Sequence, residues 1–232
     1  MSRDILILRP QPGANETAAR ARALGLEPVV APLFTVRPLP WTAPEGPFDA
    51  VMLTSANAAR HGGGGVAPFF DLPCFAVGDA TAAAAQEAGF ADVRTGPADG
   101  AALLEEIAEA GPRYLLHPCG QDHRRMSRPG IAIADVPVYV SEAADALDPR
   151  AVAALQRHAL VLLHSPRAAA LFRTLVASPD AICLAAISDA TVEAAGTGWA
   201  SIAVAARPRD EALLELAAEL CQTVPMMGRP TA

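Results

Sequence analysis

The second half of this chain repeats the first half at an offset of about 110 residues. Residues 51–55 read VMLTS and residues 161–165 read VLLHS, while Asp-Ala-Thr occurs at residues 79–81 and again at 189–191. The repeat includes hydroxyl groups that follow apolar runs, which is where α/β folds place ligand sites. We therefore expect two similar units that present two sets of polar groups to one ligand.

Composition narrows the class of protein. With 232 residues, of which 52% are hydrophobic, the chain can form two cores of roughly 100 residues each. The net charge of −7 and the lack of a basic stripe argue against a nucleic-acid partner. All 18 basic residues are arginine, which excludes a Schiff-base lysine and a phosphate-loop lysine.

The compartment is predicted to be the cytoplasm. The first residues, MSRDI, place charges before the first apolar run and are unlike a signal peptide. The four cysteines are widely spaced and form no Cys-x-x-Cys pair. No uncharged apolar stretch approaches the ~20 residues that span a bilayer, so no membrane association is expected.

Short apolar runs alternate with alanine-rich helical patterns along the whole chain. This alternation predicts an α/β fold with parallel sheets covered by helices. Ten strands are expected, five in each unit: residues 5–8, 28–31, 50–54, 74–77, 92–94, 114–117, 132–139, 160–164, 182–186 and 201–204.

Two segments without periodicity divide the chain. Residues 36–48 contain four prolines, and residues 141–148 form a weaker break. If both are crossings between domains, residues 1–36 plus 142–232 form a discontinuous first domain and residues 41–139 a second. Residues 37–40 and 140–141 then serve as connectors. A single cut near Gly111-Pro112 would also leave five strands on each side, but offers only a tight turn.

Two sequence features are interpreted as having no ligand role. His117, Cys119 and His123 lie close in sequence, but no second group has zinc-like spacing, so no metal is expected. Four consecutive glycines, residues 62–65, lack a phosphate-loop signature and are predicted to form a flexible surface loop.

Polar residues gather at the predicted strand-to-helix turns. The turns are residues 54–57 (TSAN), 78–81 (GDAT), 164–167 (HSPR) and 188–191 (SDAT). Taken singly, each Ser, Thr or Asp is typical of a helix cap, and Asp79 and Asp189 are predicted to be caps. In symmetric pairs these turns predict a shared anion-binding site, since helix N-termini bind carboxylates. Arg9, Arg124, Arg125 and Arg167 follow predicted strands and could add bidentate carboxylate contacts.

Tyr139 is one of two tyrosines. Period-two alternation in residues 136–140 (VPVYV) places the valines on one face of the strand and Tyr139 on the other. The residue also lies beside a predicted crossing. From spacing alone, an amphipathic tyrosine at a sheet edge is the favoured interpretation.

Together these segments resemble uroporphyrinogen-III synthase over essentially the whole chain. The matching segments are residues 5–10 (ILILRP), 53–58 (LTSANA), 77–82 (VGDATA), 118–120 (PCG) followed by Arg124, 138–139 (VY) and 164–166 (HSP). Two departures stand out. Ser188 occupies the place of a family glycine, and residues 62–65 interrupt a stretch that is commonly helical.

The resemblance implies two flavodoxin-like, doubly wound domains joined by a two-stranded connector. It implies a lyase of tetrapyrrole and heme biosynthesis that acts without a cofactor. The enzyme would cyclise hydroxymethylbilane to uroporphyrinogen III, releasing water and inverting ring D through a spiro intermediate. A monomer is expected.

Loss of the ring A hydroxyl requires a proton donor. A phenol stays protonated at neutral pH, so Tyr139 is the candidate catalytic residue. Positioning the chain ends for attack on ring D is expected to matter at least as much. The candidate substrate-binding residues are Arg9, Thr54, Ser55, Asn57, Gly78, Thr81, Gly120, Arg124, Ser165, Arg167, Ser188 and Thr191.

The main alternative is a non-catalytic two-domain binding protein or sensor for a small anionic ligand. Such a protein would use the same turns but would not need a phenol beside the crossing. A dinucleotide-binding oxidoreductase is a weaker alternative, because no Gly-x-Gly-x-x-Gly follows a strand.

Overall fold

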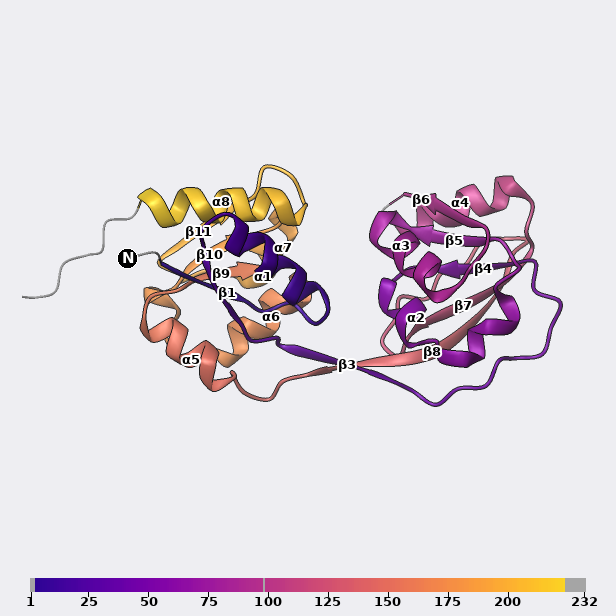
Figure 1. The fold of residues 1–232 in the computed structure, drawn as a ribbon, viewed down its shortest axis with the longest axis horizontal. Helices are drawn as coiled ribbons and strands as arrows, with labels where there is room; N and C mark the ends of the chain where they lie inside the picture. The colour runs from indigo at the N-terminus through magenta and orange to yellow at the C-terminus, as the bar shows by residue number, and fades with distance from the viewer. Residues whose placement is uncertain (1–2, 98, 224–232) are drawn as a thin grey trace, which may run out of the picture. The chain divides into compact units, whose positions relative to one another are not determined.

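The computed structural model describes residues 3–97 and 99–223 and divides the chain into two compact units. The first unit runs to Thr35 and resumes at Ala143, and the second unit is Val36–Glu142 (Figure 1). In the described part of the chain, no helix combines the length and apolar character that crossing a membrane requires.

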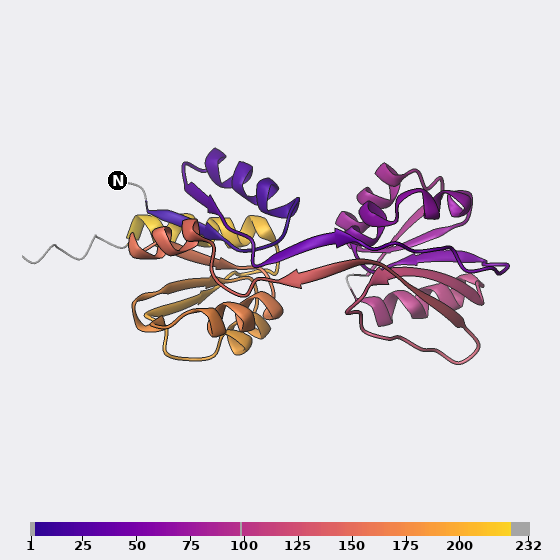
Figure 2. The same ribbon diagram turned by 90° about the horizontal axis from the view of Figure 1, so that it is seen from below.

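The first unit is a five-stranded parallel sheet with helices on both faces (Figure 2). Its strand order is β11-β10-β9-β1-β2, which in chain order is the flavodoxin-like arrangement 5-4-3-1-2. The strands are β1 (Asp4–Ile7), β2 (Glu27–Val30), β9 (Leu160–Leu163), β10 (Cys183–Ala186) and β11 (Ser201–Val204). The helices are α1 (Gly13–Ala23), α5 (Pro149–Gln156), α6 (Pro166–Leu175), α7 (Asp189–Ala195) and α8 (Asp210–Thr223), with a 3-10 turn η2 (Pro179–Ala181).

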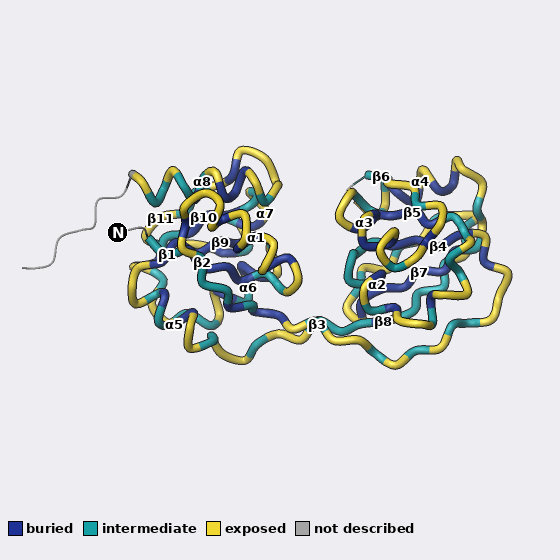
Figure 3. The backbone as a smooth tube through the Cα atoms, in the orientation of Figure 1, coloured by how far each residue is buried: buried dark blue, intermediate teal, exposed yellow. Residues whose placement is uncertain are grey.

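Alternation along the strands of this sheet builds two cores. In β1, Leu6 faces the side covered by α5, α6 and α7, whereas Ile5 and Ile7 face α1 and α8. All three residues are fully buried. In Figure 3 the central strands of this sheet carry the dark blue of buried residues. Burial on both faces explains why these strands are continuous apolar runs in the sequence.

The second unit repeats this plan. Its sheet has the order β3-β8-β7-β4-β5-β6. The five strands other than β3 are parallel to one another. The strands are β3 (Phe34–Pro38), β4 (Ala50–Leu53), β5 (Cys74–Val77), β6 (Val93–Gly96), β7 (Tyr114–Gly120) and β8 (Ala132–Ala143). α2 (Ala56–His61), α3 (Gly78–Ala88) and the 3-10 helix η1 (Gly63–Phe69) cover one face, and α4 (Gly100–Ala110) covers the other.

The internal repeat corresponds to equivalent positions in the two sheets. β4 carries VML and β9 carries VLL, and each is the third strand from one edge of its sheet. β4 lies between β7 and β5, and β9 lies between β1 and β10. The predicted α/β fold with doubly wound, flavodoxin-like units is therefore confirmed.

The two-stranded connector is formed by β3 and β8. Leu39 N donates to Val138 O at 2.9 Å, and Ala144 N donates to Leu33 O at 2.9 Å, so the strands run antiparallel. Both unit boundaries fall within this ribbon. Arg37 and Glu142 form an ion pair across it.

Three local predictions were wrong. Residues 34–38 form strand β3, although residues 36–48 were expected to be a linker. Pro38 is the last residue of β3 and Pro40 lies beyond it, so neither proline interrupts the strand. β3 pairs with β8. The four glycines lead into η1, because Trp41 donates to Gly62 O at 2.8 Å and lies against Gly65. Asp79 and Asp189 lie within the first turns of α3 and α7, where Val77 and Ser188 hold the cap positions.

Candidate functional site

The predicted substrate-binding residues of each unit lie where its parallel strands end. We call those of the second unit the second-unit rim: Thr54, Ser55, Asn57, Gly78, Thr81, Gly120 and Arg124. The first-unit rim consists of Arg9, Ser165, Arg167, Ser188 and Thr191. Since all carboxyl ends of a parallel sheet meet at one edge, the residues of each rim share one edge of their own sheet.

The serines of the rims cap helices. Ser55 Oγ accepts from Asn57 N at 3.2 Å at the start of α2, and Ser165 Oγ accepts from Ala168 N at 3.2 Å at the start of α6. Ser188 instead forms a hydrogen bond with Thr191 Oγ1 at 3.0 Å. All three serines are partly exposed. They therefore combine a structural role with access to a ligand.

The two threonines of the Asp-Ala-Thr turns are buried. Thr81 is 5% exposed and Thr191 is fully buried. Gly78, in contrast, is partly exposed, has a φ of +66° and has open space where a side chain would be. In the turn after β5, the backbone at the start of α3 is thus more accessible than the threonine hydroxyl.

Tyr139 on β8 lies beside Gly120 on the neighbouring strand β7. The two residues are register partners beside a β-bulge, and a Cβ added at Gly120 would lie 2.8 Å from Tyr139 Cζ and 2.9 Å from Oη. Tyr139 is partly exposed, and its ring centroid lies 6.2 Å from that of His61 in α2. The missing side chain at Gly120 lets the phenol lie against the end of β7.

We expect Gly120→Ala to displace the Tyr139 ring, because a real Cβ does not approach an aromatic carbon at 2.8 Å. If Tyr139 is catalytic, turnover should fall by roughly 10-fold, since misplacing a reacting group by about 1 Å can cost up to 100-fold. Gly64→Ala is the matched control, because nothing lies within 4 Å of its added Cβ. Equal turnover in both variants, measured alongside unfolding curves, would show that the Tyr139–Gly120 contact has no functional role.

Behind the second-unit rim lies a hydrogen-bonded chain with a buried histidine at its centre. Asp135 Oδ1 accepts from His117 Nδ1 at 2.7 Å, and the Thr54 hydroxyl lies 3.1 Å from His117 Nε2. His117 is 1% exposed, and burial lowers its pKa despite the adjacent carboxylate. In the neutral imidazole, Nδ1 therefore carries the proton and Nε2 accepts from Thr54.

A second buried cluster lies behind the first-unit rim, around Asp210 at the start of α8. Asp210 Oδ1 accepts from Thr17 Oγ1 at 2.8 Å and lies 2.9 Å from His164 Nε2. Oδ2 accepts from Arg20 at 2.5 Å, and Arg9 lies 3.5 Å from Oδ1. Burial alone would raise the pKa of Asp210, but these hydrogen bonds outweigh burial and lower it to about 2.

Sequence reasoning missed Asp135, His164 and Asp210 as members of these clusters. Asp135 meets His117 through the register of two parallel strands, and Asp210 is 193 residues from Thr17. No local motif signals either contact. Arg9 was found, but its charge is shared with Asp210, so the side chain is less available to a ligand than expected.

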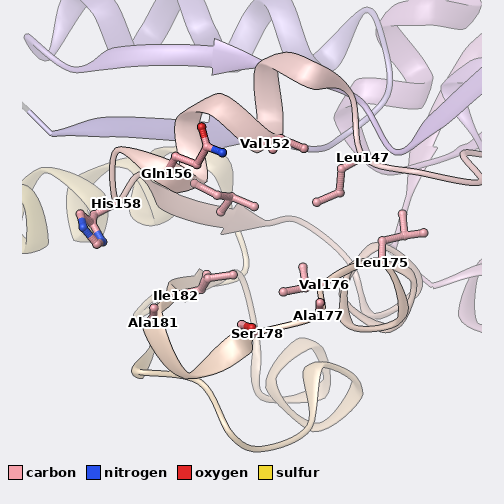
Figure 4. Close-up of a pocket in the computed structure, with 11 residues that line it drawn as sticks. Leu147, Val152, Gln156, His158, Leu175, Val176, Ala177, Ser178, Ala181 and Ile182 are labelled. Carbon is pink, nitrogen blue, oxygen red and sulfur yellow. The ribbon is translucent and has the colours of Figure 1, made fainter.

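An open pocket of about 370 Å³ lies elsewhere in the first unit (Figure 4). Its walls include Val152 and Gln156 of α5, Leu175 at the end of α6, and Ile182 just before β10. It therefore lies toward the amino ends of the strands and contains no rim residue. We assign it no part in the chemistry.

The geometry defines a class of protein: two flavodoxin-like units, each with a polar rim at the carboxyl edge of its sheet. A family model described as uroporphyrinogen-III synthase HemD matches residues 15–215. The chain belongs to the uroporphyrinogen-III synthase family. This family is one of lyases in heme biosynthesis, and nothing favours the alternative of a non-catalytic sensor.

Solved structures agree with this assignment at the level of the fold. The chain is similar to the uroporphyrinogen-III synthetase of Helicobacter pylori 26695, with a TM-score of 0.66, 19% identity and coverage of 94% of this chain and 99% of that chain. A mutant uroporphyrinogen III synthase of the extremely thermophilic bacterium Thermus thermophilus gives a TM-score of 0.48 at 15% identity, covering 95% and 100%. No curated protein sequence matches the chain.

Proposed function

We propose that this chain converts hydroxymethylbilane to uroporphyrinogen III, with Tyr139 as the proton donor. Membership of the synthase family over residues 15–215 is the observation that carries the proposal. The placement of Tyr139 supports it, because the phenol is partly exposed at the carboxyl edge of the second-unit sheet.

The chemistry requires one proton and a precise arrangement of the substrate. The C–O bond to the ring A hydroxyl breaks, and the Tyr139 phenol protonates the departing oxygen. The methylene carbon left on ring A is electron-deficient, and the electrons of the pyrrole ring stabilise it. The ring A methylene carbon then bonds to the substituted carbon of ring D, which gives the spiro intermediate. The bond between that ring D carbon and the bridge to ring C breaks, and the bridge carbon bonds to the unsubstituted α-carbon of ring D. That carbon loses its proton to the Tyr139 phenolate, which restores both the aromatic ring and the phenol. Apart from these proton transfers, the protein contributes mainly by holding the reacting carbons together.

Substrate binding is proposed to rest on local groups of both rims. The substrate bears eight carboxylates, and a chain with a net charge of −7 does not attract it from a distance. Arg124 and Arg167 are exposed and carry guanidinium groups. With the helix-start amides near Gly78, they supply the charge-assisted hydrogen bonds that carboxylates need.

Arg124→Ala is expected to raise the Michaelis constant for hydroxymethylbilane by about 10-fold, with a smaller change in kcat. One charge-assisted hydrogen bond contributes ~1.5–3 kcal/mol, and exposure to water places the loss at the lower end. Arg94→Ala is the matched control, because this arginine of the same unit is paired with Asp92 outside the rim. If the two variants have the same Michaelis constant, Arg124 does not bind substrate.

The remaining parts of the proposal concern the setting. We place the enzyme in the cytoplasm as a monomer without a nucleic-acid partner. The four free cysteines support a reducing compartment, and the acidic net charge disfavours nucleic acid. Isomer analysis of the product tests the activity itself, because hydroxymethylbilane left alone closes to the type I isomer.

A further inference from the structure

Three potential metal ligands converge behind the second-unit rim. His117 on β7 and Asp135 on β8 are register partners, and Cys119 lies two residues further along β7 on the same face. One ligand atom from each residue lies within 4.8 Å of the others. His117 and Cys119 are each 1% exposed.

A fourth side chain enters from the loop that follows β7. His123 Nδ1 lies 3.0 Å from Gly120 O, so this nitrogen carries a proton and donates it. The other ring nitrogen, Nε2, is 3.2 Å from Asp135 Oδ2 but is not aligned for a hydrogen bond. Nε2 is buried and has no hydrogen-bond partner in the described structure.

Either a second proton on His123 or a metal ion is needed between His123 and Asp135. A neutral imidazole that donates through Nδ1 has a lone pair on Nε2, and here it faces a carboxylate oxygen. Two lone pairs at this distance repel each other unless a proton or a metal ion lies between them. Two ligand atoms that are each ~2.0–2.1 Å from a tetrahedral zinc are about 3.3 Å apart, close to the spacing seen here.

We propose that the cluster of His117, Cys119 and Asp135 binds zinc and that His123, whose ring nitrogen Nε2 in the structure meets only Asp135 of this cluster, closes in from its loop as the fourth ligand. Two imidazoles, one thiolate and one carboxylate are a ligand set that suits tetrahedral zinc. This site is separate from the proposed synthase chemistry, and it departs from the expectation that the chain holds no metal.

Proton balance is consistent with zinc binding. Zinc displaces the Cys119 thiol proton, which is released to solvent, and the Nδ1 proton of His117, which is transferred to Nε2 of the same ring. His117 stays neutral and donates from Nε2 to Thr54 Oγ1, which changes from donor to acceptor. His123 already has the required tautomer, held by the Gly120 carbonyl. Without a metal, burial raises the pKa of Cys119 to about 12, so the thiol stays neutral.

The consequence of zinc binding would be to fix the loop of residues 121–130 to the sheet. His123 is the ligand from this loop, and its neighbours Arg124 and Arg125 are exposed. A bound ion would thereby set the position of Arg124 on the second-unit rim. The site is structural, because the four protein ligands complete its coordination.

Cobalt binding to the full chain tests the site directly. After treatment with a chelator, the protein is titrated with Co²⁺ and then with Zn²⁺. We expect one ion per chain, the ligand-field bands of tetrahedral cobalt and a thiolate-to-cobalt charge-transfer band. Cys119→Ser should abolish the charge-transfer band, whereas Cys74→Ser, a buried cysteine of β5, should keep it.

His123→Ala provides an independent variant, because His123 lies in a loop and its removal leaves the sheet core intact. We expect zinc affinity to fall by roughly 100-fold. Loss of a residue that only hydrogen-bonds to a ligand typically costs about 10- to 100-fold, and loss of a ligand itself should cost at least the upper value. Zinc should also slow trypsin cleavage after Arg124 and Arg125 in the unaltered chain but not in His123→Ala.

Two results would overturn the proposal. One is a folded, chelator-treated chain that binds neither Co²⁺ nor Zn²⁺ more tightly than His123→Ala does. The other is a charge-transfer band that survives in Cys119→Ser. In either case a proton on His123, rather than a metal, bridges His123 and Asp135.

Discussion

Tyr139→Phe is expected to slow the formation of uroporphyrinogen III by about 100-fold while leaving the fold intact. A positioned general acid contributes ~100- to 10,000-fold, and water reaching a partly exposed site can replace part of that effect. The phenylalanine ring keeps the packing against Gly120. The loss should therefore appear in kcat, with little change in the Michaelis constant.

The other tyrosine provides the control for this experiment. Tyr114 begins β7, at the opposite end of the strand from Gly120, and packs on Phe48 with ring centroids 4.5 Å apart. Tyr114→Phe should retain full turnover. If Tyr139→Phe forms the type III isomer as fast as Tyr114→Phe does, Tyr139 has no catalytic role.

Asp210→Ala is expected to lower the free energy of unfolding by about 2–3 kcal/mol. Removing one member of a buried ion pair costs ~3–5 kcal/mol, and partial exposure of Arg9 and Arg20 reduces this figure. The Thr17 hydroxyl and His164 Nε2 also lose their partner. Urea unfolding at neutral pH measures the difference, with exposed Asp71→Ala as the control.

The same carboxylate makes stability depend on pH. The pKa of Asp210 is about 2 in the folded chain and ~3.9 when unfolded, so below pH ~5 the unfolded state takes up more protons. Burial lowers the pKa of His164, which adds to the loss of stability from pH ~6.5 downward. Asp210 should contribute about 2 kcal/mol at neutral pH that is lost by pH ~2. An acid limb as steep in Asp210→Ala as in the unaltered chain would contradict this account.

The parallel strands could be predicted well from the sequence. Each strand is buried on both faces and is therefore a short, continuous run of apolar residues. Leu160 to Leu163 is such a run, and all four residues are fully buried. β3 was missed because its segment, FTVRP, ends in proline and has one strongly buried residue, Phe34. Its strand conformation comes from pairing with β8, which a local pattern does not encode.

The candidate site divides in the same way. Rim residues such as Ser55 and Ser165 directly follow an apolar run, so the sequence alone places them at strand ends. The burial of Thr81 and Thr191, and the pairing of His117 with Asp135, depend on packing and register between distant segments.

The isomer ratio of the product tests the central claim most directly. Purified chain is incubated with hydroxymethylbilane, and the cyclised product is oxidised and separated into type I and type III. We predict that type III predominates with the intact protein and that type I predominates with heat-denatured protein or buffer alone. If the folded protein gives the same type I product as buffer, the chain does not invert ring D and is not a working synthase.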